Sequence, residues 1–206
     1  VGGDFYDVLK LDDRRVGISV GDVCGKGVPA SLFMAITQTV TRLVVRQEAD
    51  LATALARANR LLCADNVSSM FATLFYGILD LETGEFIYCN CGHNPPLVVR
   101  RDGALEMLTN TGIALAMFDD APYSSRTITL EPGERIFLYS DGITEAHNAE
   151  KVLFGDDRLE ETVKVAADLP GRQAIDNIIS AVDEFAGEAP QFDDITCLSL
   201  HYLPAS

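Results

Sequence analysis

The sequence predicts an α+β fold in which two antiparallel sheets pack face to face and helices cover their outer faces. β-prone runs follow one another with short turns between them, which is typical of hairpins. Helical patterns occur in two separate pairs, so the order differs from the strict strand–helix alternation of a doubly wound parallel sheet. Several strands are apolar throughout, as expected for strands that are covered on both faces.

Proline and aspartate mark the two helices expected in the first half of the chain. Pro29 suits the first turn of a helix, and Asp50 is placed to cap the next one. Apolar residues recur at helical spacing after each of them, and we expect both stripes to lie in the core. The stripe of the first helix comprises Leu32, Phe33, Ile36, Val40, Leu43 and Val44. The expected elements are strands at 5–11 and 16–20, helices over 29–44 and 51–62, and strands at 71–81 and 86–88.

The second half predicts further hairpin strands, a second helix pair and a last strand. Gly103 and Gly133 lie in turn signals between β-prone runs. Pro170 ends one helical pattern, and Gly187 ends the next. The expected elements are strands at 97–99, 105–108, 127–130 and 136–140, helices over 157–167 and 175–185, and a strand at 195–202.

Composition limits the class of protein. The 206 residues, 48% of them hydrophobic, suit one globular domain over 1–206. A net charge of −15 repels nucleic acid and anionic membrane, so we expect neither as a partner. No stretch approaches a membrane span, because polar residues interrupt the most apolar region, 28–45. Five cysteines without a CxxC pair indicate reduced thiols in a cytoplasmic protein. The chain opens inside a motif, and we therefore expect a piece of a longer regulatory protein.

Four short acidic motifs carry the functional interpretation. Each places a carboxylate beside an apolar run, where it must be solvated, paired or bound to a metal. If several such strand ends converge, they form an all-oxygen site suited to Mg²⁺ or Mn²⁺. The motifs are Gly2-Gly3-Asp4, Gly21-Asp22-Val23, Ser140-Asp141-Gly142 and Asp193-Asp194-Ile195-Thr196.

Asp22 offers the strongest single motif. Its carboxylate and the carbonyl of Val23 are hard oxygen ligands at the end of an apolar strand. Gly25 and Gly27 allow the backbone to bend around a site before the next helix. The alternative for Asp22 is an ordinary helix cap.

The other acidic residues have simpler alternatives. Asp141 also fits an ordinary Asp-Gly turn. Asp193 and Asp194 are adjacent, so only one can face a shared site, and a solvated acidic loop is the alternative for both. Asp4, beside the glycines, is a better ligand candidate than Asp7, which we expect to be structural.

Two further polar residues are more easily explained without chemistry. His93 lies in a loop, where a hydrogen bond that stabilises a turn is favoured over catalysis. Lys26 either faces an anionic substrate or is a solvated loop lysine, and the second interpretation is favoured.

Taken together, the motifs resemble the metal-dependent protein phosphatases of the PP2C (PPM) superfamily, in the bacterial RsbU/SpoIIE-type branch. Ala116 stands where that family often has Gly, a departure expected to matter little. The matching stretches are Val1–Asp7, Gly21–Ala30, Phe71–Thr73, Cys91–Pro96, Leu138–Glu145, Phe154–Gly155 and Asp193–Thr196.

This resemblance implies a four-layer αββα sandwich with two Mn²⁺ or Mg²⁺ ions at one end. By motif position, Asp22 resembles the bridging carboxylate, and the Val23 carbonyl an additional ligand. Asp4 resembles the acidic ligand of one metal, and Asp141 and Asp193 those of the other. Asp194 takes a supporting role, together with Gly25 and Gly27; Asp22 and Asp141 are the residues expected to matter most for catalysis.

The resemblance further implies a serine/threonine protein phosphatase that uses a water activated by the two metals. It suggests an anti-sigma-factor antagonist of the STAS type as the phosphoprotein substrate, an upstream sensor or activator domain in stress signalling, and a possible homodimer. Two alternatives remain open: a catalytically silent module that sequesters a regulator, and a domain with a single Ca²⁺ site.

Overall fold

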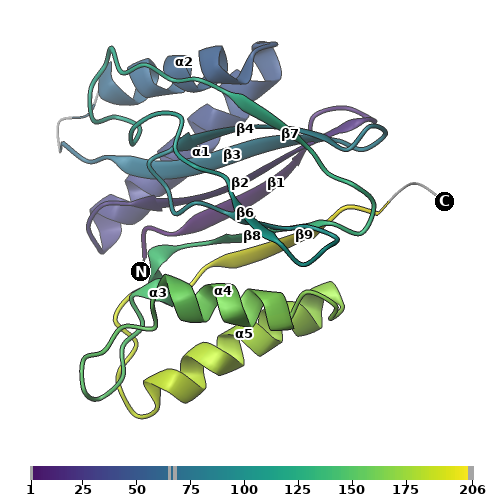
Figure 1. The fold of residues 1–206 in the computed structure, drawn as a ribbon. Helices are drawn as coiled ribbons and strands as arrows, with labels where there is room; N and C mark the ends of the chain where they lie inside the picture. The colour runs from purple at the N-terminus through teal and green to yellow at the C-terminus, as the bar shows by residue number, and fades with distance from the viewer. Residues whose placement is uncertain (1, 65, 67–68, 204–206) are drawn as a thin grey trace.

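The computed structural model describes residues 2–64, 66 and 69–203; Val1, the first residue of the opening motif, lies outside them. Two antiparallel sheets lie between two pairs of helices, which confirms the predicted four-layer α+β sandwich (Figure 1). The elements are β1 (Phe5–Lys10), β2 (Arg15–Val23), α1 (Val28–Gln47), α2 (Leu51–Ala64), β3 (Ala72–Asp80), β4 (Glu85–Cys91), β5 (Leu97–Val99), β6 (Leu105–Met107), β7 (Arg126–Thr129), β8 (Arg135–Tyr139), α3 (Asp141–Thr144), α4 (Gly155–Val165), α5 (Gly171–Ala186) and β9 (Cys197–His201).

Strand register brings the ends of distant segments to the same end of the sandwich. One sheet has the order β1-β2-β3-β4-β7 and the other β6-β5-β8-β9, and every pairing is antiparallel. Phe5 pairs with Gly21, so the start of β1 lies beside the end of β2. Tyr139 pairs with Cys197, so the end of β8 lies beside the start of β9. The short helix α3 and the N-terminus lie at this end (Figure 1).

Each helix pair covers the outer face of one sheet. Helices α1 and α2 lie on the five-stranded sheet, and α4 and α5 lie on the four-stranded sheet (Figure 1). Between the sheets, Phe75 stacks on Phe86 and Tyr88, with ring centroids 6.3 Å and 5.6 Å apart. Burying such rings stabilises the fold by apolar transfer and by specific ring packing.

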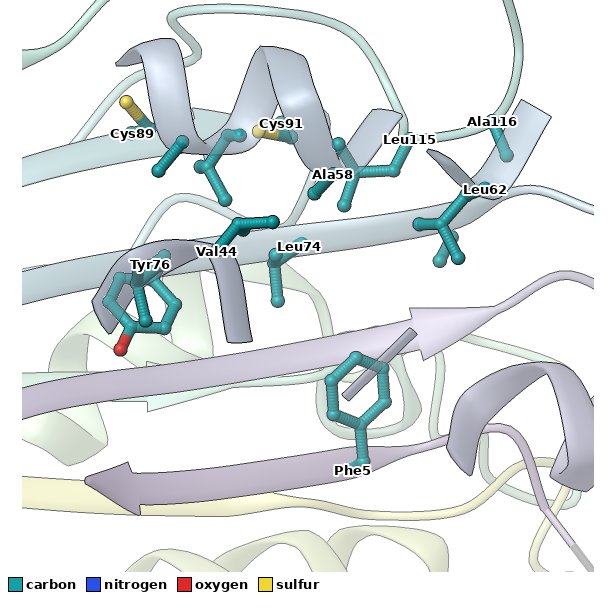
Figure 2. Packing of buried hydrophobic residues seen from close by; sticks show 14 of the residues in the cluster. Phe5, Val44, Ala58, Leu62, Leu74, Tyr76, Cys89, Cys91, Leu115 and Ala116 are labelled. Carbon is teal, nitrogen blue, oxygen red and sulfur yellow. The ribbon is translucent and has the colours of Figure 1, made fainter. Parts of the chain in front are cut away.

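The core under α1 and α2 is built from both strands and helices. Leu74 and Tyr76 of β3 face Val44 of α1 and Ala58 of α2 within one buried cluster, and Phe5 of β1 closes its edge (Figure 2). Cys89 and Cys91 are also buried there, and burial raises the pKa of each thiol. All five cysteines are free thiols, as the sequence predicted.

The predicted core stripe of α1 is wrong for three of its members. Leu32, Ile36 and Leu43 are 61%, 53% and 51% exposed. The residues that α1 buries are Ala30, Thr37, Thr41, Val44 and Val45. The apolar arc of this helix is wider than the strip that the sheet and α2 cover, so helical periodicity identified the arc without showing which edge of it is packed.

The hydropathy of α1 also differs from expectation. With 20 residues and a mean hydropathy of 1.4 over its most apolar window, α1 is long and apolar enough to cross a membrane by length and composition alone. In this fold it packs against β1, β2 and α2. A helix that covers a sheet meets the same criterion, and the buried threonines of α1 face the protein interior.

Local signals account for most helix boundaries. Pro29 lies in the first turn of α1, and the Asp50 carboxylate accepts a 2.7 Å hydrogen bond from the Thr53 amide at the start of α2, both as predicted. Helix α4 begins at Gly155 rather than at Asp157. The single turn α3 was not predicted, and it places Asp141 at the start of a helix rather than in an Asp-Gly turn.

Candidate metal centre

Backbone hydrogen bonds hold the acidic motifs together at one end of the sandwich. The amide of Val23 donates to the Gly3 carbonyl at 3.3 Å, which joins the first two motifs. The amide of Ser140 donates to the Thr196 carbonyl at 2.9 Å, which joins the last two. Each contact joins two motifs, and the Asp4 side chain, which interacts with Ser140 and Thr196, links the two pairs.

Asp4 and Asp22 form the buried half of the centre. Burial, together with the charges of Asp4, Asp141 and Asp193, raises the pKa of Asp22 to about 7. Burial also raises the pKa of Asp4, although hydrogen bonds with Ser140, Thr196 and Asp22 oppose this shift. The Oδ2 atom of Asp4 is buried and has no hydrogen-bond partner among the described residues. A buried oxygen in that state indicates a missing positive partner.

Asp141 and Asp193 form the more open half. Burial raises the pKa of Asp141, and the neighbouring Asp193 carboxylate adds to the effect. The charge of Lys26 lowers the pKa of Asp141, and the Nζ of Lys26 lies 3.2 Å from Oδ2 of Asp193. The four predicted carboxylates are therefore close enough for the charges of Asp4, Asp141 and Asp193 to raise the pKa of Asp22.

The donor set fits hard divalent cations. It consists of carboxylate and carbonyl oxygens, the ligands that Mg²⁺ and Mn²⁺ prefer. Mutual repulsion between the carboxylates, together with the unpartnered oxygen of Asp4, is what a bound cation relieves. Within the described residues, no three His, Cys, Asp or Glu side chains already stand at metal-ligand spacing. The structure thus shows converging, electrically coupled carboxylates rather than a closed coordination shell.

Glycines make the close approach of these segments possible. A Cβ on Gly3 would lie 2.5 Å from the Val23 carbonyl oxygen and 2.9 Å from Oδ1 of Asp22. A Cβ on Gly142 would lie 2.0 Å from the Asp194 carbonyl oxygen, and one on Gly2 only 1.2 Å from the Asp194 carboxylate. Asp194 is exposed and stands in the loop before β9, as its alternative had it, and its carboxylate and carbonyl lie against Gly2 and Gly142.

Helix α1 decides one alternative and one expectation from the sequence. Helix α1 has Gly27 as its N-cap, so Asp22 does not cap it. Gly25 and Gly27 have φ of 89° and 84°, a left-handed conformation that favours glycine, and they carry the chain from β2 into α1. Asp7 is buried and pairs with Arg42 of α1, which is the structural role expected of it.

Thr73 and His93 lie directly behind the centre, and the sequence did not single them out as a pair. Thr73 is paired with Asp22 across β2 and β3, and its hydroxyl donates to the Asp22 carbonyl at 3.4 Å. The same hydroxyl lies 2.9 Å from Nδ1 of His93. The amide of His93 donates to Oδ1 of Asn90 at 2.9 Å, so the expected turn hydrogen bond is present as well. Both residues stand in motifs that carried the family resemblance, and that was the available signal.

Comparison with known proteins shows the family of the chain. The model of the family described as stage II sporulation protein E (SpoIIE) matches residues 12–203. The chain belongs to the SpoIIE family. It is therefore a PP2C-type domain of the protein serine/threonine phosphatase class, in the RsbU/SpoIIE branch.

Relatives in this family are longer proteins. Protein IcfG of Synechocystis sp. is 30% identical over 98% of the chain, and the phosphoserine phosphatase RsbU of Bacillus subtilis is 31% identical over 70%. These matches cover 36% of IcfG and 43% of RsbU, so the chain spans less than half the length of either relative.

Solved structures share the whole fold. The RsbU and RsbW domains of a Mycobacterium tuberculosis protein match with a TM-score of 0.81 and 28% identity, over 100% of this SpoIIE-family chain and 56% of theirs. The SiaA PP2C domain of Pseudomonas aeruginosa matches with a TM-score of 0.86 and 22% identity, over 98% of this chain and 81% of that one, which shows the fold alone.

Proposed function

We propose that this domain is a metal-dependent phosphatase that hydrolyses phosphoserine or phosphothreonine on a regulatory protein. The observation that supports it best is the coupling of Asp4, Asp22, Asp141 and Asp193 at one end of a PP2C-type sandwich. RsbU and RsbP, both named phosphoserine phosphatases, are relatives of the chain. A further relative in fold, RsbX, has been crystallised with magnesium.

In this proposal the carboxylates hold two Mn²⁺ or Mg²⁺ ions. Asp22, the Val23 carbonyl, Asp4, Asp141 and Asp193 would hold them, with Asp22 shared between the two. The ions supply Lewis acidity that neutralises the phosphoryl group and lowers the pKa of a nucleophilic water. The protein orients the carboxylates: Gly3 and Gly142 permit their approach, and Thr73 fixes the Asp22 backbone. Asp194 supports the Gly2 and Gly142 segments from behind.

The substrate and partners are proposed from the relatives. An anti-sigma-factor antagonist of the STAS type suits a domain related to RsbU, and the M. tuberculosis structure combines RsbU and RsbW domains in one protein. Because the relatives are more than twice as long as the matched region, an upstream sensor or activator domain of a cytoplasmic protein fits the same proposal, as does a homodimer.

The test is Mn²⁺-dependent hydrolysis of p-nitrophenyl phosphate and of a phosphoserine peptide, combined with metal titration by calorimetry. We expect two ions per chain and turnover that Asp22→Asn abolishes. The exposed Asp168→Asn provides the matched control and should behave as the wild type. Equal turnover rates of the wild type and Asp22→Asn would contradict the proposed hydrolase activity. Two ions without turnover would favour a silent binding module, and a single ion would favour a Ca²⁺ domain.

A further inference from the structure

Lys26 is held at the edge of the acidic centre by three contacts from one loop. Its Nζ lies 3.2 Å from Oδ2 of Asp193 and donates to the Phe192 carbonyl at 3.0 Å. It also lies 5.0 Å above the centre of the Phe192 ring, within cation–π range. The solvated lysine favoured by the sequence is therefore wrong in one respect: the side chain is exposed, but it is fixed in place beside a predicted metal ligand.

A cavity opens next to this ammonium group. It has a volume of about 440 Å³ and is lined by Gly2, Lys26, Gly27 and the four loop residues from Gln191 to Asp194. Gly27 is also the N-cap of α1, whose first turn has no acidic residue. The positive end of the helix dipole and the Lys26 charge thus border the same space. Asp193 borders it too, so the cavity adjoins the candidate metal centre directly.

The Lys26–Asp193 ion pair contributes little to the stability of the fold. The side chains of Lys26 and Asp193 are 62% and 35% exposed, and ion pairs of that kind contribute about 0–1 kcal/mol. A lysine is, however, a compact point charge on a flexible stem with three donors, which suits the binding of phosphoryl oxygens. Its contact with Asp193 is weak enough to be exchanged for a dianion that enters the cavity.

We propose that Lys26 is the protein group that binds the phosphoryl oxygens of the substrate and positions them at the centre. This inference rests on the proposed function, because it assigns Lys26 to the same reaction. The Asp193 contact holds the ammonium at the mouth of the centre in the absence of substrate. When the phosphoryl group enters, Lys26 turns from Asp193 to a phosphoryl oxygen, while Phe192 keeps the side chain over the cavity.

The test compares Lys26→Gln with Lys26→Arg, and uses Lys164→Gln, an exposed lysine near the end of α4, as the matched control. Binding of inorganic phosphate is measured by calorimetry on Mg²⁺-saturated protein, and KM and kcat are measured with p-nitrophenyl phosphate. We expect Lys26→Gln to weaken phosphate binding about tenfold or more, the loss of one charge-assisted hydrogen bond, and to raise KM more than it lowers kcat. Lys26→Arg should restore most of the affinity, and Lys164→Gln should change nothing.

Equal phosphate affinity in Lys26→Gln and the wild type would overturn the inference. The inference would also be overturned if Lys26→Gln lost metal affinity but bound phosphate normally once saturated with Mg²⁺. Lys26 would then serve only to orient Asp193. The phosphate titration does not depend on turnover. A wild type that binds phosphate through Lys26 but hydrolyses nothing would therefore support the role of Lys26 and contradict the proposed hydrolase.

Discussion

Thr73 and His93 form a buried pair, with the threonine hydroxyl 2.9 Å from Nδ1 of the imidazole. The hydroxyl also reaches the Asp22 carbonyl, so the pair stands behind the residue proposed to bridge the metals. The Nε2 atom of His93 is buried without a hydrogen-bond partner among the described residues. Burial lowers the pKa of His93 to about 4, and the ring is therefore neutral at pH 7.

This pair makes folding sensitive to acid. At pH values between 6.5, the ordinary pKa of histidine, and about 4, the pKa of His93 in the folded state, the unfolded chain binds a proton that the folded chain does not. Stability should therefore fall as the pH drops through that window, by about 3 kcal/mol from this group. Urea unfolding of wild type and His93→Asn from pH 7 to pH 4 checks it, because the carboxyl groups and His201 contribute equally to both proteins. If the free energy of unfolding changed with pH in the same way in both proteins, His93 would not be held neutral in the folded state.

The acidic centre should lower the stability of the metal-free domain. The folded pKa of Asp22, about 7, is above its ordinary value of 3.8, so the folded state tolerates its charge poorly. The stability of the wild type should therefore decline relative to Asp22→Asn as the pH rises from about 4 to 7. In EDTA at pH 8, Asp22→Asn should be more stable by ~1–2 kcal/mol, a value reduced for solvent exposure.

Thermal unfolding with and without metal provides the measurement. The advantage of Asp22→Asn should disappear near pH 4, where the wild-type carboxyl is protonated and resembles the amide. Saturating Mn²⁺ should reverse the order at pH 8, because only the wild type gains binding free energy. If Asp22→Asn is less stable in EDTA at pH 8, the carboxylates do not repel one another as described.

The sequence was sufficient for the layers, for the acidic candidates and for the order of elements apart from the single turn α3. Hairpins, Pro29 and Asp50 act through neighbouring residues, and local signals of that kind can be read directly from a chain. The exposure of Leu32 and Ile36 could not be read in this way, since it depends on where the neighbouring sheet ends. The position of Lys26 beside Asp193 joins residues from opposite ends of the chain, and only the fold brings them together.

Ala116 is a second place where the structure revises an expectation. Its φ is 65°, a left-handed conformation that Gly adopts without strain, and its amide donates to Oδ1 of the buried Asn59 at 2.8 Å. Ala116→Gly should therefore stabilise the domain by about 0.5–1 kcal/mol, the strain relieved minus the backbone entropy added. Ala114→Gly, at a neighbouring buried alanine that is not among the positive-φ residues, should destabilise it. Urea unfolding gives the change in the free energy of unfolding for each variant. A change of the same sign in both would contradict backbone strain at Ala116 as the cause.

Gly3 provides the sharpest test of the geometry of the centre. A methyl group there meets the Val23 carbonyl at 2.5 Å and Oδ1 of Asp22 at 2.9 Å, two oxygens proposed as ligands of the same site. Backbone at that distance cannot move aside as a flexible side chain can, so Gly3→Ala should displace both oxygens. We expect Mn²⁺ affinity to fall about tenfold or more, in line with other disturbances of groups that orient metal ligands. Gly171→Ala at the start of α5, where a Cβ meets nothing within 4 Å, is the control. Calorimetric titration of both variants, with circular dichroism to establish folding, decides the outcome: a folded Gly3→Ala that binds Mn²⁺ like the control means that the metal is held elsewhere.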